Sequence, residues 1–240
     1  MMATSLSDLT VKLFADGADR ATMLDLYRNP IIQGFTTNPT LMRKAGITGY
    51  KEFALDIVRS IPDRPISFEV FADEFDEMEI QARKIATWGE NVYVKIPVTN
   101  TRREPALDLI SKLAHAGVKL NVTALLTLDQ VREVTSALAG GAPACVSIFA
   151  GRIADTGRDP VPLMAAAVEI ISGYPNMELI WASPRELLNI FQASDIGCHI
   201  ITATNDILKK LPLVGKNLDD YSLETVCMFY EDAERAKFEI

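Results

Sequence analysis

The sequence is poor in the residues that build metal centres and disulfide frameworks, with three cysteines and two histidines among 240 residues. Cys145, Cys198 and Cys227 lie far apart and form no C-x-x-C motif, which argues against a disulfide framework or a zinc site. With only His115 and His199 available, a histidine-rich metal site or a Ser-His-Asp triad is hard to build. We therefore expect no metal, and three unpaired thiols fit a reducing cytoplasm best.

The sequence also lacks an excess of positive charge and any long apolar run. Its formal net charge is −8, and no basic run or Lys/Arg patch interleaved with aromatic residues occurs, so we expect no nucleic-acid partner. No run of about 18 apolar residues is present, and residues 1–10 carry no apolar signal core. We expect a protein that is not exported and not inserted in a membrane.

Short β-branched or aromatic runs recur along the chain, and each is followed by helical periodicity. Eight such pairs fit in about 200 residues, and no G-x-G-x-x-G motif follows the first run. These features favour a closed (β/α)8 TIM barrel over a doubly wound sheet. We predict an α/β fold with one domain over residues 1–240 and a C-terminal helix at about 222–238. The predicted strands are 11–16, 34–38, 66–71, 92–96, 120–124, 145–149, 179–183 and 199–203.

Lys95 is the most informative residue because it ends a strand pattern that is otherwise hydrophobic, Val92 to Ile96. An ammonium group is costly to bury, and desolvation favours the neutral amine that attacks a carbonyl to form a Schiff base. Taken alone, Lys95 fits better a second interpretation, in which it snorkels from the strand end or pairs with a carboxylate, and the rest of the chain reverses this preference.

Polar side chains gather where the predicted strands end. If side chains alternate along each strand, Tyr93 and Lys95 point into the barrel, and polar residues of the other strands share that inner face. Active sites of barrel enzymes are assembled at this end. So many polar groups in one pore would be costly to bury without a ligand, which predicts a site there. The inner-face candidates are Asp16, Asn38, Glu69, Asn121, Thr123, Ser147, Phe149, Trp181 and Ser183.

Two segments resemble the signatures of a known family. The segment Gly34-Phe35-Thr36-Thr37-Asn38-Pro39-Thr40-Leu41-Met42 is similar to the transaldolase signature, and Val94 to Thr99 resembles the segment that carries the family's Schiff-base lysine. The likeness extends from Phe14 to at least Cys198. The family includes transaldolases and fructose-6-phosphate aldolases, which are class I (β/α)8 enzymes without a cofactor. The resemblance implies sugar-phosphate substrates, a place in the pentose phosphate pathway of carbohydrate metabolism, and a homo-oligomer.

The resemblance also assigns roles to individual residues. Lys95 matches the amine that forms the iminium, and Asp16 matches the general acid/base that acts at the C4 hydroxyl. Glu69 and Thr123 match the pair that holds a catalytic water. The positions that match residues binding the three-carbon unit are Thr37, Asn38, Asn121 and Ser147.

The resemblance implies an anion site beyond the sixth and seventh strands. Arg152, Ser183 and Arg185 match the family's phosphate-binding positions. Guanidinium groups bind phosphate bidentately, and the start of the helix that follows Ser183 adds donors. Pro184 stands where an aromatic residue is usual, so another anionic group, such as a sulfonate, or a specialised sugar stays an alternative.

Glu69 and Phe149 distinguish the two branches of the family. The aldolase branch carries a glutamine and a tyrosine at these positions, so both residues resemble the transaldolase branch. Without the tyrosine hydroxyl to help protonate the enamine, we expect transfer of dihydroxyacetone to an aldehyde acceptor. One alternative is an aldolase that releases free dihydroxyacetone. Another is a catalytically silent barrel that binds sugar phosphates, since a fold alone does not guarantee activity.

Overall fold

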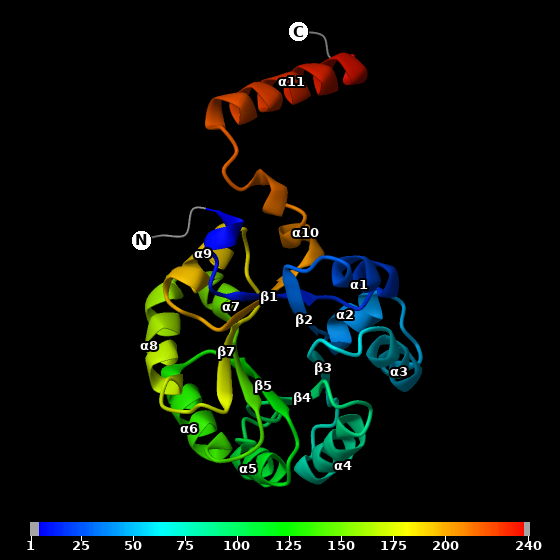
Figure 1. Cartoon of the computed structure of the whole chain (residues 1–240), viewed down its shortest axis with the longest axis vertical. Helices are drawn as coiled ribbons and strands as arrows, with labels where there is room; N and C mark the ends of the chain where they lie inside the picture. The colour runs from blue at the N-terminus through cyan, green and yellow to red at the C-terminus, as the bar shows by residue number, and fades with distance from the viewer. Residues whose placement is uncertain (1–4, 238–240) are drawn as a thin grey trace.

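The chain folds as a closed (β/α)8 barrel, as the sequence predicted (Figure 1). A computed structural model describes residues 5–237. Eight strands form one closed parallel sheet in chain order, with β8 pairing back to β1. The strands are β1 Lys12–Asp16, β2 Ile32–Thr36, β3 Ile66–Glu69, β4 Val92–Pro97, β5 Leu120–Leu125, β6 Ala144–Ile148, β7 Met177–Trp181 and β8 Ile200–Thr204.

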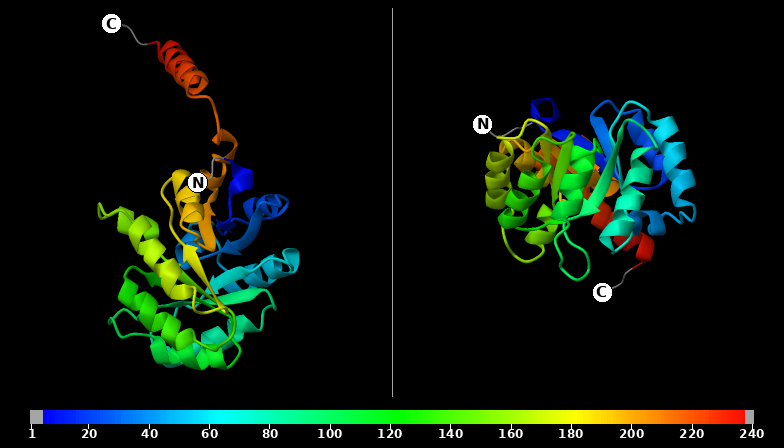
Figure 2. Two further views of the ribbon diagram at one scale, coloured as in Figure 1. Left: turned by 60° about the vertical axis from the view of Figure 1, so that its left-hand side comes forward. Right: turned by 90° about the horizontal axis from the view of Figure 1, so that it is seen from below.

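Helices connect the strands and surround the barrel, as Figures 1 and 2 show. None of the helices within residues 5–237 is both long enough and apolar enough to cross a membrane. Two short 3-10 helices lie at Leu6–Asp8 and Leu211–Leu213. The α-helices are α1 Arg20–Tyr27, α2 Pro39–Lys44, α3 Tyr50–Ser60, α4 Phe75–Ala86, α5 Leu107–His115, α6 Leu128–Leu138, α7 Ala150–Ala154, α8 Val161–Ile171, α9 Leu188–Asp195, α10 Asn205–Leu208 and α11 Leu218–Ala236.

Local sequence signals explain where two of these helices begin. Asn38 caps α2, because its side-chain oxygen accepts from the Leu41 amide at 2.9 Å, and Pro39 occupies the first helical position. Thr127 and Gln130 form a capping box at the start of α6. The α2 cap holds Asn38 at the end of the barrel where the strands finish.

Apolar side chains form two cores. The larger core fills the layer between the strands and the surrounding helices. A smaller core fills the inside of the barrel and includes Phe14, Cys145, Ile180 and Ile200, with Tyr93 packed against it. The prediction that Tyr93 faces inward is therefore confirmed.

Strand β7 corrects the predicted alternation. We expected Trp181 and Ser183 on the inner face with Ala182 between them, but Trp181 belongs to the outer core and Ala182 to the inner one. Ser183 still reaches the inside because its φ of 58° is left-handed, which breaks the alternation one residue after Ala182.

The sheet register aligns polar residues across neighbouring strands. Glu69 lies opposite Lys95, and Lys95 lies opposite Asn121, so three polar residues form one row across β3, β4 and β5. Asp16 lies opposite Thr36 on β2. Asp16, Thr36 and Glu69 are the last residues of their strands, at the end of the barrel where active sites form, whereas Lys95 and Asn121 lie deeper along β4 and β5.

Helix α11 stands apart from the barrel. Figures 1 and 2 both show it projecting beyond α10 at the end of the chain. It spans Leu218–Ala236 and has no buried residue, so it does not pack against its own barrel. Phe238, the end of the C-terminal helix in our prediction, lies outside the described residues.

Candidate active site

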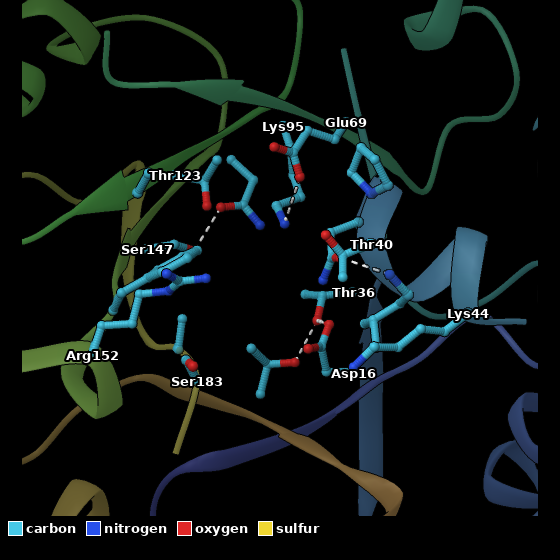
Figure 3. A pocket seen from close by; sticks show the side chains of 18 residues that line it. Asp16, Thr36, Thr40, Lys44, Glu69, Lys95, Thr123, Ser147, Arg152 and Ser183 are labelled. Atoms are coloured by element: carbon cyan, nitrogen blue, oxygen red, sulfur yellow. Dashed lines mark hydrogen bonds and ion pairs between the residues drawn. The ribbon is translucent and has the colours of Figure 1, made fainter. Parts of the chain in front are cut away.

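A cavity of about 490 Å³ opens at the C-terminal end of the barrel (Figure 3). Of the residues to which the family resemblance gave a role, all line it except Thr37 and Arg185, and the inner-face candidate Trp181 does not line it either. The candidates that line the cavity are Asp16, Asn38, Glu69, Lys95, Asn121, Thr123, Ser147, Phe149, Arg152 and Ser183.

Lys95 lies at the inner end of this cavity and is 6% exposed. Its Nζ lies 3.1 Å from Glu69 Oε2 and donates to the backbone carbonyl of Thr37 at 3.1 Å. Lys95 therefore has a carboxylate partner and faces a cavity large enough to admit a small molecule. Both interpretations of Lys95 agree with this pair, because a paired ammonium becomes a nucleophile once its proton moves to the carboxylate.

Thr123 supplies an unpaired hydroxyl close to this pair. Its Oγ1 is buried and has no hydrogen-bond partner among the described residues. Buried polar groups of this kind are nearly always satisfied by water or by a ligand. Figure 3 shows Thr123 facing the same cavity as Lys95 and Glu69. The three side chains therefore line one cavity, in which the Thr123 hydroxyl is available to a water molecule or a substrate hydroxyl.

Asp16 faces the cavity from the end of β1. Its carboxylate accepts a hydrogen bond from Thr36 Oγ1 at 2.8 Å. Burial raises the pKa of Asp16 above its ordinary value, and the Lys95 ammonium and the Thr36 hydrogen bond counteract part of this rise. A carboxyl group with a raised pKa is well suited to take up and return a proton during turnover.

The amide and hydroxyl side chains on β5 and β6 form a fixed hydrogen-bonded group. Asn121 donates to Ser67 Oγ at 3.0 Å, and Ser147 donates to Asn121 Oδ1 at 2.7 Å. All three residues are buried. Thr37 lies behind the cavity, where its hydroxyl donates to the Ser67 carbonyl at 2.8 Å. Thr37 therefore reaches the site through its carbonyl contact with Lys95, not through its side chain.

Arg152 and Ser183 line the cavity on the side opposite Lys44, as Figure 3 shows. The Arg152 guanidinium lies over the Phe149 ring, 5.5 Å from its centroid. Arg185 points elsewhere and forms a two-pronged ion pair with Asp155, with Nε donating to Oδ1 at 2.9 Å. Only Arg152 of the two arginines therefore presents its charge to the cavity.

Four polar residues of the cavity were not among our candidates: Thr36, Thr40, Lys44 and Thr202. Thr36 and Thr40 belong to the signature segment, so the motif contained the signal. Lys44 ends α2, almost two helical turns from Asn38. Its side chain lines the cavity only because of the orientation of α2 relative to the barrel, which the sequence does not show. Thr202 lies within an apolar run. The signal that could have identified it as a site residue is its position on the inner face of β8.

Comparison with known proteins identifies the family of this chain. Residues 13–240 match the model of the family described as transaldolase/fructose-6-phosphate aldolase. A probable transaldolase of Dehalococcoides mccartyi is 36% identical over 202 residues, 84% of this chain and 90% of that protein. A probable transaldolase of Streptococcus agalactiae is 37% identical over 215 residues, 88% of this chain and 95% of that protein.

Solved structures share the fold at low sequence identity. The 3-hexulose-6-phosphate synthase of Salmonella typhimurium superposes with a TM-score of 0.57 at 13% identity, covering 83% of this chain and 91% of that one. Likeness at this level of identity speaks for the barrel alone. The family match over most of the chain and the curated relatives together carry the assignment: this chain belongs to the transaldolase/fructose-6-phosphate aldolase family.

Proposed function

We propose that this protein is a transaldolase that moves a dihydroxyacetone unit from a ketose phosphate to an aldehyde acceptor. Sedoheptulose 7-phosphate or fructose 6-phosphate would be the donor, and the reaction would belong to the pentose phosphate pathway in the cytoplasm. The observation that carries the proposal is the pair of buried Lys95 and half-buried Glu69, 3.1 Å apart, in a cavity also lined by Asp16 and by Thr123, whose hydroxyl has no partner among the described residues.

The first half of the reaction cleaves the donor. Glu69 takes a proton from Lys95, directly or through a water held with Thr123, and the amine adds to the C2 carbonyl carbon. Loss of water from the carbinolamine gives an iminium. Asp16 then removes the proton from the C4 hydroxyl, the C3–C4 bond breaks, and its electron pair moves toward the iminium to give an enamine. The aldose phosphate leaves.

The second half builds the product. The enamine carbon C3 attacks the carbonyl carbon of the acceptor, and Asp16 returns its proton to the new hydroxyl oxygen. Water adds to the iminium, and the product ketose is released with Lys95 restored. Asn38, Asn121 and Ser147 would hold the hydroxyl groups of the three-carbon unit between the two halves. Arg152 and Ser183 would bind the phosphate.

Phe149 favours transfer over simple cleavage. Its ring lines the cavity and offers no hydroxyl that could protonate the enamine. The enamine should therefore wait for an acceptor aldehyde. If turnover of fructose 6-phosphate were independent of an added acceptor, the aldolase alternative would replace this proposal.

Borohydride trapping tests the proposal. Incubation with fructose 6-phosphate and borohydride should label Lys95, identified by peptide mass, and Lys95→Met should remove both the label and the transfer activity. Lys119→Met, at a half-buried lysine before β5 that does not line the cavity, serves as the control and should keep both. A label on another lysine, or full activity of Lys95→Met, would refute the mechanism.

A further inference from the structure

A chain of two threonine hydroxyls connects β8 to the carboxylate of Asp16. Thr202 Oγ1 lies 2.5 Å from Thr36 Oγ1, and Thr36 Oγ1 lies 2.8 Å from Asp16 Oδ1. Thr36 and Thr202 come from β2 and β8, the two strands that flank β1 in the barrel. Both threonines are nearly inaccessible to solvent, at 2% and 5% exposure. The hydroxyls therefore meet inside the barrel, beside the proposed general acid/base.

The number of hydroxyl protons fixes which group donates in each of these two hydrogen bonds. An ionised carboxylate only accepts hydrogen bonds, so Thr36 must donate its single hydroxyl proton to Asp16. Thr36 then has no proton left for Thr202, and Thr202 must donate to Thr36. When Asp16 is protonated, it can donate to Thr36, and both threonine hydroxyls can turn so that Thr36 donates to Thr202. The two hydroxyl groups can therefore keep both hydrogen bonds whether Asp16 is ionised or protonated.

The charged groups around Asp16 come from other elements. Lys95 on β4 and Glu69 on β3 act on Asp16 with opposite signs, and Lys44 of α2 and Arg152 of α7 line the same cavity. The two threonines differ from these groups because they are neutral, and Thr36, in contact with Thr202, binds one oxygen of the Asp16 carboxylate. Their effect should therefore persist at high salt, where charge effects at the cavity mouth weaken.

We propose that Thr202 is a positioning residue that holds the Thr36 hydroxyl against Asp16 and so sets the proton affinity of the catalytic carboxylate. The inference rests on the proposed function for its kinetic consequence, but the hydroxyl chain itself does not depend on it. Replacing the Thr202 hydroxyl by a methyl group would put a carbon 2.5 Å from Thr36 Oγ1, which is too close, so Thr36 must move away from Asp16.

The experiment compares Thr202→Val, Thr202→Ala, Thr202→Ser and Thr36→Val. Because the Thr36 hydrogen bond lowers the pKa of Asp16, its loss should raise that pKa further. As the base, Asp16 must be ionised, so the acidic limb of the pH profile of kcat/KM should move to higher pH in Thr202→Val. At neutral pH kcat should fall about tenfold with KM changed little, since the bond lost is one to a charged group. Thr36→Val should shift further, and Thr202→Ser should restore the original profile.

Thr135→Val provides a matched control. Thr135 is also a buried threonine, but its hydroxyl donates to the Val131 carbonyl within α6, and the residue does not line the cavity. This variant should leave the pH profile unchanged. Thr202→Ala keeps the test valid if the bulkier valine prevents folding, because alanine only removes atoms. Borohydride trapping at Lys95 should be unaffected in every variant.

A direct titration separates this inference from the proposed function. The Asp16 carboxyl signal, assigned by its loss in Asp16→Asn, can be titrated by ¹³C NMR whether or not the protein turns over sugars. A higher midpoint in Thr202→Val supports the inference. An unchanged or lower midpoint in both Thr202→Val and Thr202→Ala overturns it, even if transaldolase activity is present. Absence of transaldolase activity in the unmutated protein would instead refute the proposed function alone.

Discussion

Two arginines that the sequence assigned to one anion site have different partners in the folded chain. Arg185 donates a hydrogen bond to the Asp155 carboxylate, and this bond lowers the pKa of Asp155. Arg152 has no ion pair within 4 Å among residues 5–237, although its charge also acts on Asp155, and it lies over the Phe149 ring at the cavity. Lys44, also without a carboxylate partner in that range, lines the cavity on the other side. The free positive charge of the cavity mouth therefore belongs to Arg152 and Lys44.

This difference predicts unequal effects of substitution. Arg152→Ala should raise KM for fructose 6-phosphate about tenfold or more, because a charged hydrogen bond to phosphate is lost. Lys44→Ala should have a smaller effect of the same sign. Arg185→Ala should change KM only about twofold, since its exposed ion pair is worth little. Steady-state kinetics with phosphorylated and unphosphorylated fructose measures how much of each KM change depends on the phosphate group.

Arg158→Ala is the control, at an exposed arginine beyond α7 that does not line the cavity. If Arg185→Ala and Arg152→Ala raised KM equally for the phosphorylated donor only, Arg185 would have to leave Asp155 when phosphate binds. That outcome would contradict the assignment of the free charge to Arg152 and Lys44.

The sequence identifies some residues of the candidate site and misses others. Lys95, Asp16 and Glu69 could be selected because ionisable residues at strand ends are costly and fit a recognisable motif. Thr202 and Lys44 could not, because a threonine in a strand and a lysine at a helix end are ordinary in any fold. Their significance depends on distances between β8, β2 and α2, which no local pattern contains.

At the scale of elements, β7 illustrates a limit of strand periodicity. The sequence predicted the strand, but alternation counted from Ser183 put Trp181 inside the barrel, whereas Trp181 packs in the outer core. The left-handed φ of 58° at Ser183 turns the chain so that Ala182 and Ser183 both line the cavity. A non-glycine residue with this conformation is uncommon, and such strain concentrates at functional sites.

Gly151 makes the turn at Ser183 possible. A Cβ atom at Gly151 would lie 1.6 Å from the Ser183 carbonyl oxygen, so no side chain fits between α7 and the end of β7. The same glycine precedes Arg152. The close approach therefore holds the two residues of the proposed anion site, Arg152 and Ser183, next to each other.

Gly151→Ala should consequently damage both stability and phosphate binding. Overpacking against backbone should lower the free energy of unfolding by about 1–3 kcal/mol. KM for fructose 6-phosphate should rise while KM for unphosphorylated fructose changes less. Denaturant unfolding and steady-state kinetics measure the two effects.

Gly173→Ala is a matched control, because a Cβ atom there has no neighbour within 4 Å. It should change the free energy of unfolding by less than about 0.5 kcal/mol and leave KM unaltered. If Gly151→Ala behaved like Gly173→Ala in both measurements, the backbone contact with Ser183 would have no role in the anion site.

At the scale of the whole molecule, the barrel was predictable because each strand and helix carries its own periodicity. Eight successive strand–helix pairs are typical of a sheet that closes into a (β/α)8 barrel. Helix α11 was predictable as a helix but not in its placement. It presents large apolar side chains to solvent, including Leu223 at 63%, Val226 at 59% and Phe229 at 63% exposure. These three lie on one face at helical spacing, so the face is an apolar stripe without a partner among residues 5–237.

We propose that the α11 stripe packs against a second copy of this chain, as expected for a homo-oligomer. An exposed apolar stripe of this kind marks an association surface more often than a free one. Sedimentation velocity of the full chain should show an oligomer at micromolar concentration. Val226→Asp and Phe229→Asp should each weaken it, because a buried unpaired carboxylate is costly.

Met228→Asp adds the same charge on the opposite face of α11, where Met228 is 50% exposed, and should leave the oligomer intact. Circular dichroism of each variant verifies that the helix still forms, so that loss of the oligomer reports on the stripe and not on folding. A monomeric full chain would contradict the proposal at once. Equal weakening by Met228→Asp and Val226→Asp would show that charge on α11, not the stripe, controls association.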